Sequence, residues 1–170
     1  GSQYSRILVD RHSLKIGQPF TASSEGESNV VSFLKVGKPI RHVEIRIADD
    51  QDKALPDGHV GHIQIRGASV TEGIYNDDEA NKALFTAAGW LRSGDCGVIV
   101  DGELVITGRS KDIIIVNGQN YYPHDIEEII AHLDGIDLGK VVVAGISSAS
   151  IQTEELVAFI LYRKDIDAFP

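Results

Sequence analysis

The sequence predicts an α+β protein rich in β-strands, with a small antiparallel, barrel-like subdomain followed by the start of a small α+β domain. Two observations carry this prediction. Apolar and polar residues alternate over residues 43–47 and 63–66, which is the period-2 pattern of half-buried strands. After Arg109 the pattern changes to continuous apolar runs and one segment with apolar residues at helical spacing. The chain therefore divides into a β-rich part and a mixed part.

Two local signals add elements to the β-rich part. Asn76, followed by Glu79, predicts the cap of a short helix that runs through Phe85. The pair Asp101-Gly102 lies between two apolar runs, and such a pair predicts a tight two-residue hairpin. The β-rich part is therefore expected to contain a hairpin and one short helix.

The mixed part begins with an apolar strand over residues 113–116. Pro123 then predicts the start of a helix that Gly135 stops. The apolar residues of this helix are expected on one face: Ile126, Ile129, Ile130 and Leu133. Two further apolar runs, residues 141–144 and 156–162, predict buried strands.

Composition limits the classes of function. The chain has 170 residues, 42% of them hydrophobic and 24% charged, which is enough for an ordinary folded core. Its formal net charge of −9 argues against binding nucleic acid. No apolar run approaches the roughly 20 residues that cross a bilayer, so we expect no membrane insertion. Cys96 is the single cysteine and cannot form an internal disulfide, which favours a reducing cytoplasm.

Two residues suggest a polar binding site. Asp95 follows Gly94 in a turn, where its carboxylate can accept two hydrogen bonds from the neighbouring hydroxyls of a ribose. Arg109 ends a strand, and its planar guanidinium suits ribose oxygens or a phosphate. From the residues alone, an ordinary aspartate turn and a surface ion pair remain the alternatives.

No metal site or nucleophile is expected in this chain. His59 and His62 are three residues apart, but no third ligand follows at a spacing that zinc sites use. Cys96 has no histidine at motif spacing, and we expect it to be a small buried apolar residue.

Several segments together resemble one family. The motifs resemble the nucleotide-binding and hinge motifs of the adenylate-forming enzymes, which include acyl-CoA synthetases, adenylation domains of peptide synthetases, and luciferases. The matching segments occur in the order that this superfamily uses: residues 36–40, 55–67, 70–76, 89–95, 107–112 and 117–127. Residues 7–14, 31–34 and 120–127 further resemble the fatty acyl-AMP ligases.

The resemblance implies roles for four residues. Asp95 and Arg109 would bind the nucleotide, and Lys111 would be the hinge between two domain orientations. Gly118 would line the tunnel of the thiol substrate. Catalysis would use ATP and Mg²⁺ to convert a carboxylic acid, in this subfamily a fatty acid, into acyl-AMP. The acyl group would then pass to an acyl carrier protein, or to coenzyme A in other members.

The resemblance also implies that the chain is a C-terminal fragment. Residues 1–110 would be the β-rich C-terminal subdomain of the large adenylation domain, and residues 111–170 the first part of the mobile C-terminal domain. The family's phosphate loop, adenine motif and late catalytic lysine have no counterpart here, so we expect the fragment alone to be inactive. Three alternatives stay open: an acyl-CoA ligase, an amino-acid adenylation domain, or a non-catalytic structural or carrier-docking module.

Overall fold

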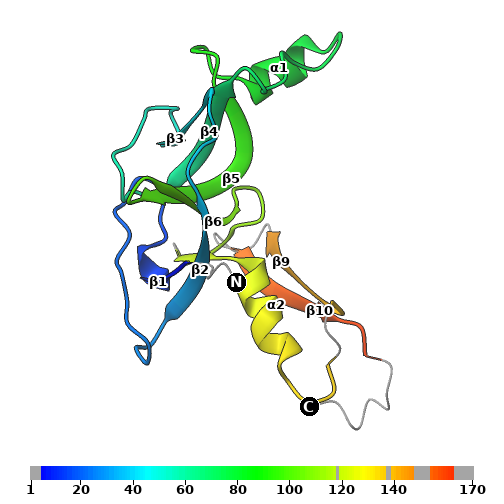
Figure 1. Cartoon of the computed structure of the whole chain (residues 1–170). Coiled ribbons are helices and arrows are strands. Elements are labelled where there is room, and N and C mark those ends of the chain that lie inside the picture. Colours follow the sequence, from blue (N-terminus) through cyan, green and yellow to red (C-terminus); the bar gives the residue numbers. More distant parts are fainter. Residues whose placement is uncertain (1–4, 118, 137–138, 148–153, 163–170) are drawn as a thin grey trace. The chain divides into compact units, whose positions relative to one another are not determined.

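The computed structural model describes residues 5–117, 119–136, 139–147 and 154–162 (Figure 1). Contacts divide the chain into two compact units, Gly1–Ser110 and Lys111–Pro170. The strands and the two α-helices of the described residues confirm the predicted β-rich α+β class.

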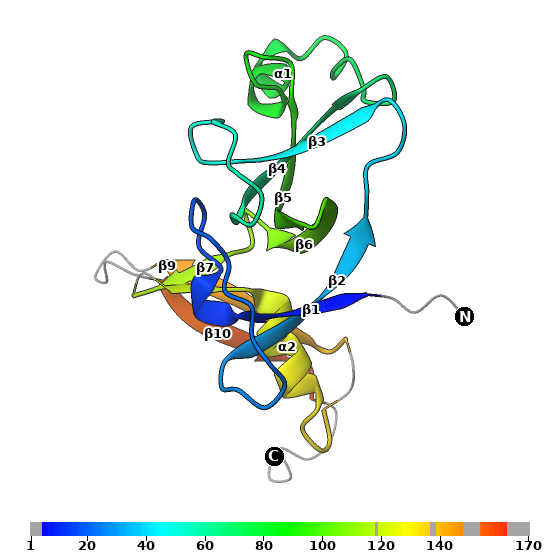
Figure 2. The ribbon, with the colours of Figure 1, turned by 60° about the vertical axis from the view of Figure 1, so that its left-hand side comes forward.

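The first unit is built on one antiparallel sheet of six strands, in the order β1-β2-β6-β5-β4-β3 (Figure 2). Hydrogen-bonded neighbours are mostly successive or nearly successive in the chain, as is usual for antiparallel sheets. The strands are β1 (Arg6–Asp10), β2 (Val30–Gly37), β3 (Val43–Ala48), β4 (Gly61–Gly67), β5 (Leu91–Val100) and β6 (Glu103–Arg109). A short 3₁₀ helix, η1 (Arg11–Ser13), follows β1.

The predicted hairpin is confirmed. Asp101 and Gly102 both have positive φ angles, 55° and 75°, between the paired strands β5 and β6. A type I′ turn requires positive φ at both central residues, and Asp-Gly meets this requirement with little strain.

The predicted helix forms with a different cap. Helix α1 spans Asp78–Leu84, and the side chain of Asp77 accepts a hydrogen bond of 2.9 Å from the backbone N–H of Ala80. The prediction that Asn76 caps the helix is wrong, because Asn76 has a φ of 52° and lies in the left-handed region. Phe85 follows the helix in an extended conformation.

Packing on β4 departs from simple alternation. Ile63 lies in the core with Ile47 and Leu104, as the alternating pattern predicts. Gln64, which that pattern places on the polar face, is 0% exposed. Arg46 donates a hydrogen bond to the amide oxygen of Gln64, and the amide nitrogen of Gln64 donates one to Asp52, so this side chain is paired although it is buried.

The described residues of the second unit form two small antiparallel sheets and one α-helix. Strand β7 (Ile114–Val116) pairs with β8 (Gln119–Tyr121), and β9 (Val141–Ser147) pairs with β10 (Glu154–Ile160). Helix α2 (Pro123–Ala131) has Pro123 at its first turn, as predicted, and packs against β9. Among the described residues, four buried side chains form a hydrophobic cluster: Ile114, Ile136, Val141 and Val143.

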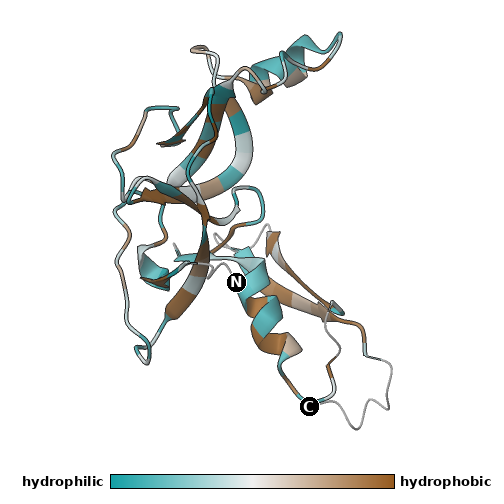
Figure 3. Ribbon diagram, viewed as in Figure 1, coloured by the Kyte–Doolittle hydropathy of each residue, from teal (hydrophilic) through white to brown (hydrophobic). Residues whose placement is uncertain are grey.

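Burial in the second unit is less complete than the sequence predicts. Ile126 and Ile130 of α2 pack on the core, but Ile129 is 60% exposed and Leu133 is also exposed. Apolar and polar bands alternate along α2 in Figure 3. Strands β9 and β10 bury one face only, since Val142 and Phe159 are paired on their outer face and both exposed. The expectation of two buried strands therefore holds for one face of this pair and is wrong for the other.

None of the helices among the described residues combines the length and the apolar character that crossing a bilayer requires.

Candidate functional site

Asp95, in the middle of β5, lies opposite Arg109, the last residue of β6. The expectation that Asp95 lies in a turn is wrong, because residues 91–100 form one continuous strand. Asp95 and Arg109 are direct cross-strand partners, with 3.6 Å between Arg109 Nε and Asp95 Oδ1. The side chain of Asp95 is 32% exposed and that of Arg109 is 75% exposed, so both remain open to solvent. A carboxylate that accepts and a guanidinium that donates thus stand side by side, which suits a ligand carrying hydroxyls and an anionic group. The structure brings together the two residues that the sequence singled out.

A β-bulge creates this pairing. Cys96 pairs with Gly108, but the next residue, Gly97, pairs with Ile106, so Thr107 is the extra residue on β6. Without the bulge, Gly108 would lie opposite Asp95 and Arg109 would be displaced by one residue. Gly97 and Gly108, two glycines inside these strands, are a general sign of a bulge or of a close backbone approach. They do not say which residue is the extra one, because that depends on how the two strands pair.

Of the other two predicted site residues, Lys111 and Gly118, the structure describes only Lys111. Lys111 is exposed in a turn after β6 and is the first residue of the second unit. Gly118 lies outside the described residues. The preceding residue, Asn117, has a φ of 51°, between the paired strands β7 and β8.

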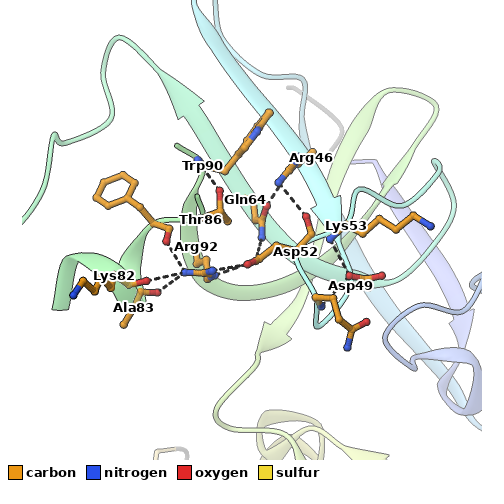
Figure 4. Close-up of polar contacts among 12 residues, drawn as sticks. Arg46, Asp49, Asp52, Lys53, Gln64, Lys82, Ala83, Thr86, Trp90 and Arg92 are labelled. Atoms are coloured by element: carbon orange, nitrogen blue, oxygen red, sulfur yellow. Dashed lines mark hydrogen bonds and ion pairs between the residues drawn. The ribbon is translucent and has the colours of Figure 1, made fainter. Parts of the chain in front are cut away.

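A polar network close to the site was not predicted (Figure 4). Arg92, three residues before Asp95, contacts Asp52 through Nε at 3.0 Å and through one terminal nitrogen at 2.5 Å. Its other terminal nitrogen donates to the carbonyls of three residues at the end of α1: Lys82, Ala83 and Phe85. One guanidinium therefore ties α1 and the β3–β4 connection to β5.

The same network extends across β3 and β4. Gln64 Nε2 donates to Asp52 Oδ1 at 2.6 Å, and Arg46 Nε donates to Gln64 Oε1 at 2.9 Å (Figure 4). The guanidiniums of Arg46 and Arg66 lie 4.4 and 4.5 Å from the ring centre of Trp90, within cation–π range. No spacing rule connects these residues in the sequence, because they come from separate strands and turns.

Removing Arg92 is expected to destabilise the first unit. Arg92→Ala leaves the Asp52 carboxylate and the last carbonyls of α1 without this donor, which should cost roughly 2 kcal/mol in the free energy of unfolding after allowance for partial exposure. Arg6→Ala is the matched control, since the Arg6–Glu25 pair is exposed and should contribute at most about 0.5 kcal/mol. Urea denaturation measures both; equal losses in the two variants would contradict a structural role for Arg92.

The network should also make stability depend on pH. The hydrogen bond from Arg92 lowers the pKa of Asp52 below its ordinary value of 3.8, while burial opposes the shift. A carboxyl whose pKa falls on folding stabilises the protein above its unfolded pKa of about 4, and this stabilisation is lost as pH falls through the folded-state pKa. We expect the stability difference between the wild type and Asp52→Asn to be largest above pH 5 and to shrink below about pH 4 in urea titrations. A difference that does not change with pH would exclude this linkage.

Cys96 has a histidine neighbour that the sequence did not reveal. His62 Nδ1 lies 3.9 Å from Cys96 Sγ, and His62 Nε2 lies 2.8 Å from Asp50 Oδ1. The order of these groups resembles a thiol catalytic triad, but Cys96 is fully buried. Burial, followed by the charges of Asp95 and Asp50, raises the pKa of the Cys96 thiol to about 12. The thiol is therefore protonated at neutral pH and is no nucleophile, in agreement with the sequence-based expectation.

Cys96 should accordingly resist thiol reagents. At pH 8, labelling by an aromatic disulfide reagent should be at least about 100-fold slower in the native protein than in denaturing urea, because both burial and the raised pKa suppress thiolate attack. Stopped-flow absorbance measures the two rates. Comparable rates would contradict the buried, protonated state.

Among the described residues, no three histidine, cysteine, aspartate or glutamate side chains gather where they could hold a metal ion.

Comparisons with known proteins show which family this chain resembles. A 4-hydroxyphenylalkanoate adenylyltransferase from Mycobacterium tuberculosis is 36% identical over 171 residues, covering 93% of this chain and 26% of the relative. A structure from a study of fatty acyl-adenylate ligases of E. coli and L. pneumophila aligns with a TM-score of 0.82 and 31% identity, over 98% of this chain and 29% of its own. The McyG A-PCP protein, solved with phenylalanyl-adenylate, aligns with a TM-score of 0.69 and 36% identity, over 82% of this chain and 25% of its own. No protein-family model matches the chain.

The chain belongs to the adenylate-forming superfamily. The resemblance found in the sequence motifs is thereby confirmed at the level of the superfamily. The chain spans only 14% of the first curated relative that it matches and 26% of the mycobacterial one. The superfamily's relatives are therefore several times longer than this chain.

Proposed function

We propose that this chain is part of an ATP-dependent ligase that activates a carboxylic acid as acyl-AMP. The observation that carries the proposal is the Asp95–Arg109 pair. These two residues form the β5–β6 cross-strand pair farthest from the hairpin turn, and both are open to solvent. Asp95 would accept hydrogen bonds from the ribose hydroxyls. Arg109 would donate to ribose oxygens or to the adenylate phosphate.

The reaction follows from this placement of the nucleotide. The substrate carboxylate attacks the α-phosphorus of ATP, the bond to the β-phosphate oxygen breaks, and pyrophosphate leaves with the bonding electron pair. Protein groups contribute by positioning and by stabilising charge. Mg²⁺, which ATP carries on its phosphates, would neutralise part of the charge that develops in this step.

The proposal extends to a second half-reaction. Residues 1–110 would belong to the large adenylation domain and residues 111–170 to the mobile C-terminal domain, with Lys111 as the pivot between them. Gly118 would face the thiol that receives the acyl group. A hinge needs a residue whose backbone is free to rotate, and the exposed turn at Lys111, between the two compact units, supports this role.

For the acid and the acceptor we propose a fatty acid and an acyl carrier protein, in a reducing cytoplasm. The alignment with the fatty acyl-adenylate ligase structure supports this choice, since it covers nearly the whole chain. The A-PCP relative favours a second candidate, an adenylation domain of a peptide synthetase that activates an amino or aryl acid. Both candidates use the same nucleotide residues.

Isotope exchange between ATP and pyrophosphate tests the proposal. The ligase that contains this chain should catalyse exchange only when its acid is present, and a panel of fatty, aryl and amino acids identifies that acid. Transfer of the labelled acyl group to a carrier protein or to coenzyme A then identifies the acceptor. Absence of exchange with every acid of the panel would argue against the proposed chemistry.

The 170-residue chain by itself should bind AMP only weakly. It offers two exposed polar contacts worth about 1 to 3 kcal/mol each, which barely offset the roughly 4 kcal/mol or more lost on association. Calorimetry should therefore show no saturable heat below about 1 mM AMP, a concentration that corresponds to about −4.1 kcal/mol. A micromolar affinity would mean that these residues hold a complete nucleotide site.

A further inference from the structure

The peptide group between Gly94 and Asp95 contributes to the direction of the Asp95 side chain, together with the pairing of Asp95 with Arg109. Asp95 follows Gly94, whose φ is 83° and beside which a Cβ would meet no atom within 4 Å. Glycine rotates freely about its backbone bonds, and no packing limits this one. The orientation of the Gly94–Asp95 peptide must therefore be fixed by hydrogen bonds.

Two serines hold that peptide by both of its polar groups. Ser93 Oγ accepts the N–H of Asp95 at 3.1 Å. The carbonyl of Gly94 accepts from the backbone N–H of Ser110 at 2.9 Å and from its hydroxyl at 3.0 Å. In a trans peptide the C=O and the N–H point in opposite directions, so the two serines form hydrogen bonds with opposite edges of the peptide plane.

Each serine is anchored in turn. Ser93 Oγ donates to the carbonyl of Ile63 at 3.0 Å, which ties this side of the peptide to β4. Ser110 directly follows β6 and is the last residue of the first unit, immediately before Lys111. Both serines are partly buried. The hydroxyl of Ser110 donates one hydrogen bond, whereas the hydroxyl of Ser93 donates one and accepts one.

We infer that Ser93 and Ser110 are positioning residues for Asp95, a pair called here the serine clamp. The inference rests on the proposed nucleotide role of Asp95. Holding the preceding peptide fixes the Cα–Cβ direction of Asp95 before the nucleotide arrives, so no binding energy is lost in ordering this part of β5. Ser110, which directly precedes the proposed pivot, also ties this part of β5 to the end of β6.

Kinetics of single substitutions test the clamp in the ligase that contains this chain. Ser93→Ala and Ser110→Ala should each raise the KM for ATP about 3- to 10-fold in pyrophosphate exchange, with kcat within about twofold. Ser93→Thr and Ser110→Thr keep the hydroxyl and should stay within about twofold of the wild type. The double alanine variant should raise KM by less than the product of the single effects, because both serines hold one peptide. A fall in kcat with unchanged KM would reveal a merely structural role and overturn the inference.

Amide hydrogen exchange tests the clamp without any nucleotide. In the 170-residue chain, the Asp95 N–H should exchange at least about fivefold faster in both alanine variants. Ser32→Ala, an exposed serine on β2, is the matched control and should leave that rate unchanged. Unchanged exchange at Asp95 in the clamp variants overturns the inference.

Asp95→Ala, assayed in parallel, separates the two proposals. If Asp95→Ala raises KM and the serine variants do not, the clamp is wrong and the nucleotide site stands. If Asp95→Ala leaves KM unchanged, the proposed function of Asp95 fails. The exchange rate of the Asp95 N–H then shows whether the clamp holds the Gly94–Asp95 peptide.

Discussion

Replacing Asp95 by alanine in the proposed ligase should raise the KM for ATP roughly 10- to 150-fold, which corresponds to a loss of about 1.5 to 3 kcal/mol. Hydrogen bonds to an ionised acceptor have this strength, and the Asp95 carboxylate is open enough to receive a ligand. The loss should fall on nucleotide binding, so kcat for pyrophosphate exchange should change much less than KM.

Asp57→Ala is the matched control for this variant. Asp57 is an exposed carboxylate in a turn of the same unit, and its removal takes away the same charge without touching the Asp95–Arg109 pair. We expect its KM for ATP to stay within about twofold of the wild type, since surface charges contribute little at this distance. A wild-type KM in the Asp95→Ala enzyme would remove the basis for a nucleotide site here.

Lys111→Pro is expected to separate the two half-reactions. Proline fixes φ near −65° and should hold the two units in one orientation, while Asp95 and Arg109 remain in place. Either adenylate formation or thioester formation should survive, and the other should fall by at least about tenfold, because one trapped orientation can serve only one step. Single-turnover assays of acyl-AMP formation and of acyl transfer measure the two rates.

Lys111→Ala is the control for the backbone effect, since it removes the ammonium group and leaves the rotation free. Both half-reactions should persist in this variant. Equal losses of both steps in Lys111→Pro, or a large loss in Lys111→Ala, would show that Lys111 is not a pivot.

Features governed by neighbouring residues could be predicted from the sequence. Asp101-Gly102 specifies a type I′ hairpin because its requirement for positive φ is local. Pro123 starts α2 for a similar reason, since its ring sets φ and it lacks the N–H that a first turn leaves unpaired. The short helix α1 was also found, but its cap moved from Asn76 to Asp77, because Asn76 takes part in the preceding left-handed turn.

Long-range contacts could not be predicted in this way. Gln64 follows the alternating pattern of an exposed residue, yet it is buried because Arg46 and Asp52 reach it from a neighbouring strand and a turn. The burial of β9 and β10 on one face only is equally a matter of which elements pack on them.

The sequence by itself determined the strand-rich α+β class and the superfamily, and it singled out Asp95 and Arg109 as candidate site residues, because each of these depends on residue types in a fixed local order. The tertiary structure alone decided how those residues meet. A bulge at Thr107 sets the register that places Arg109 opposite Asp95, and hydroxyls from Ser93 and Ser110 hold the peptide before Asp95. The Asp101-Gly102 turn sets the register of the β5–β6 hairpin near the turn, but the bulge that changes this register and the side-chain hydrogen bonds across strands depend on how the strands pack.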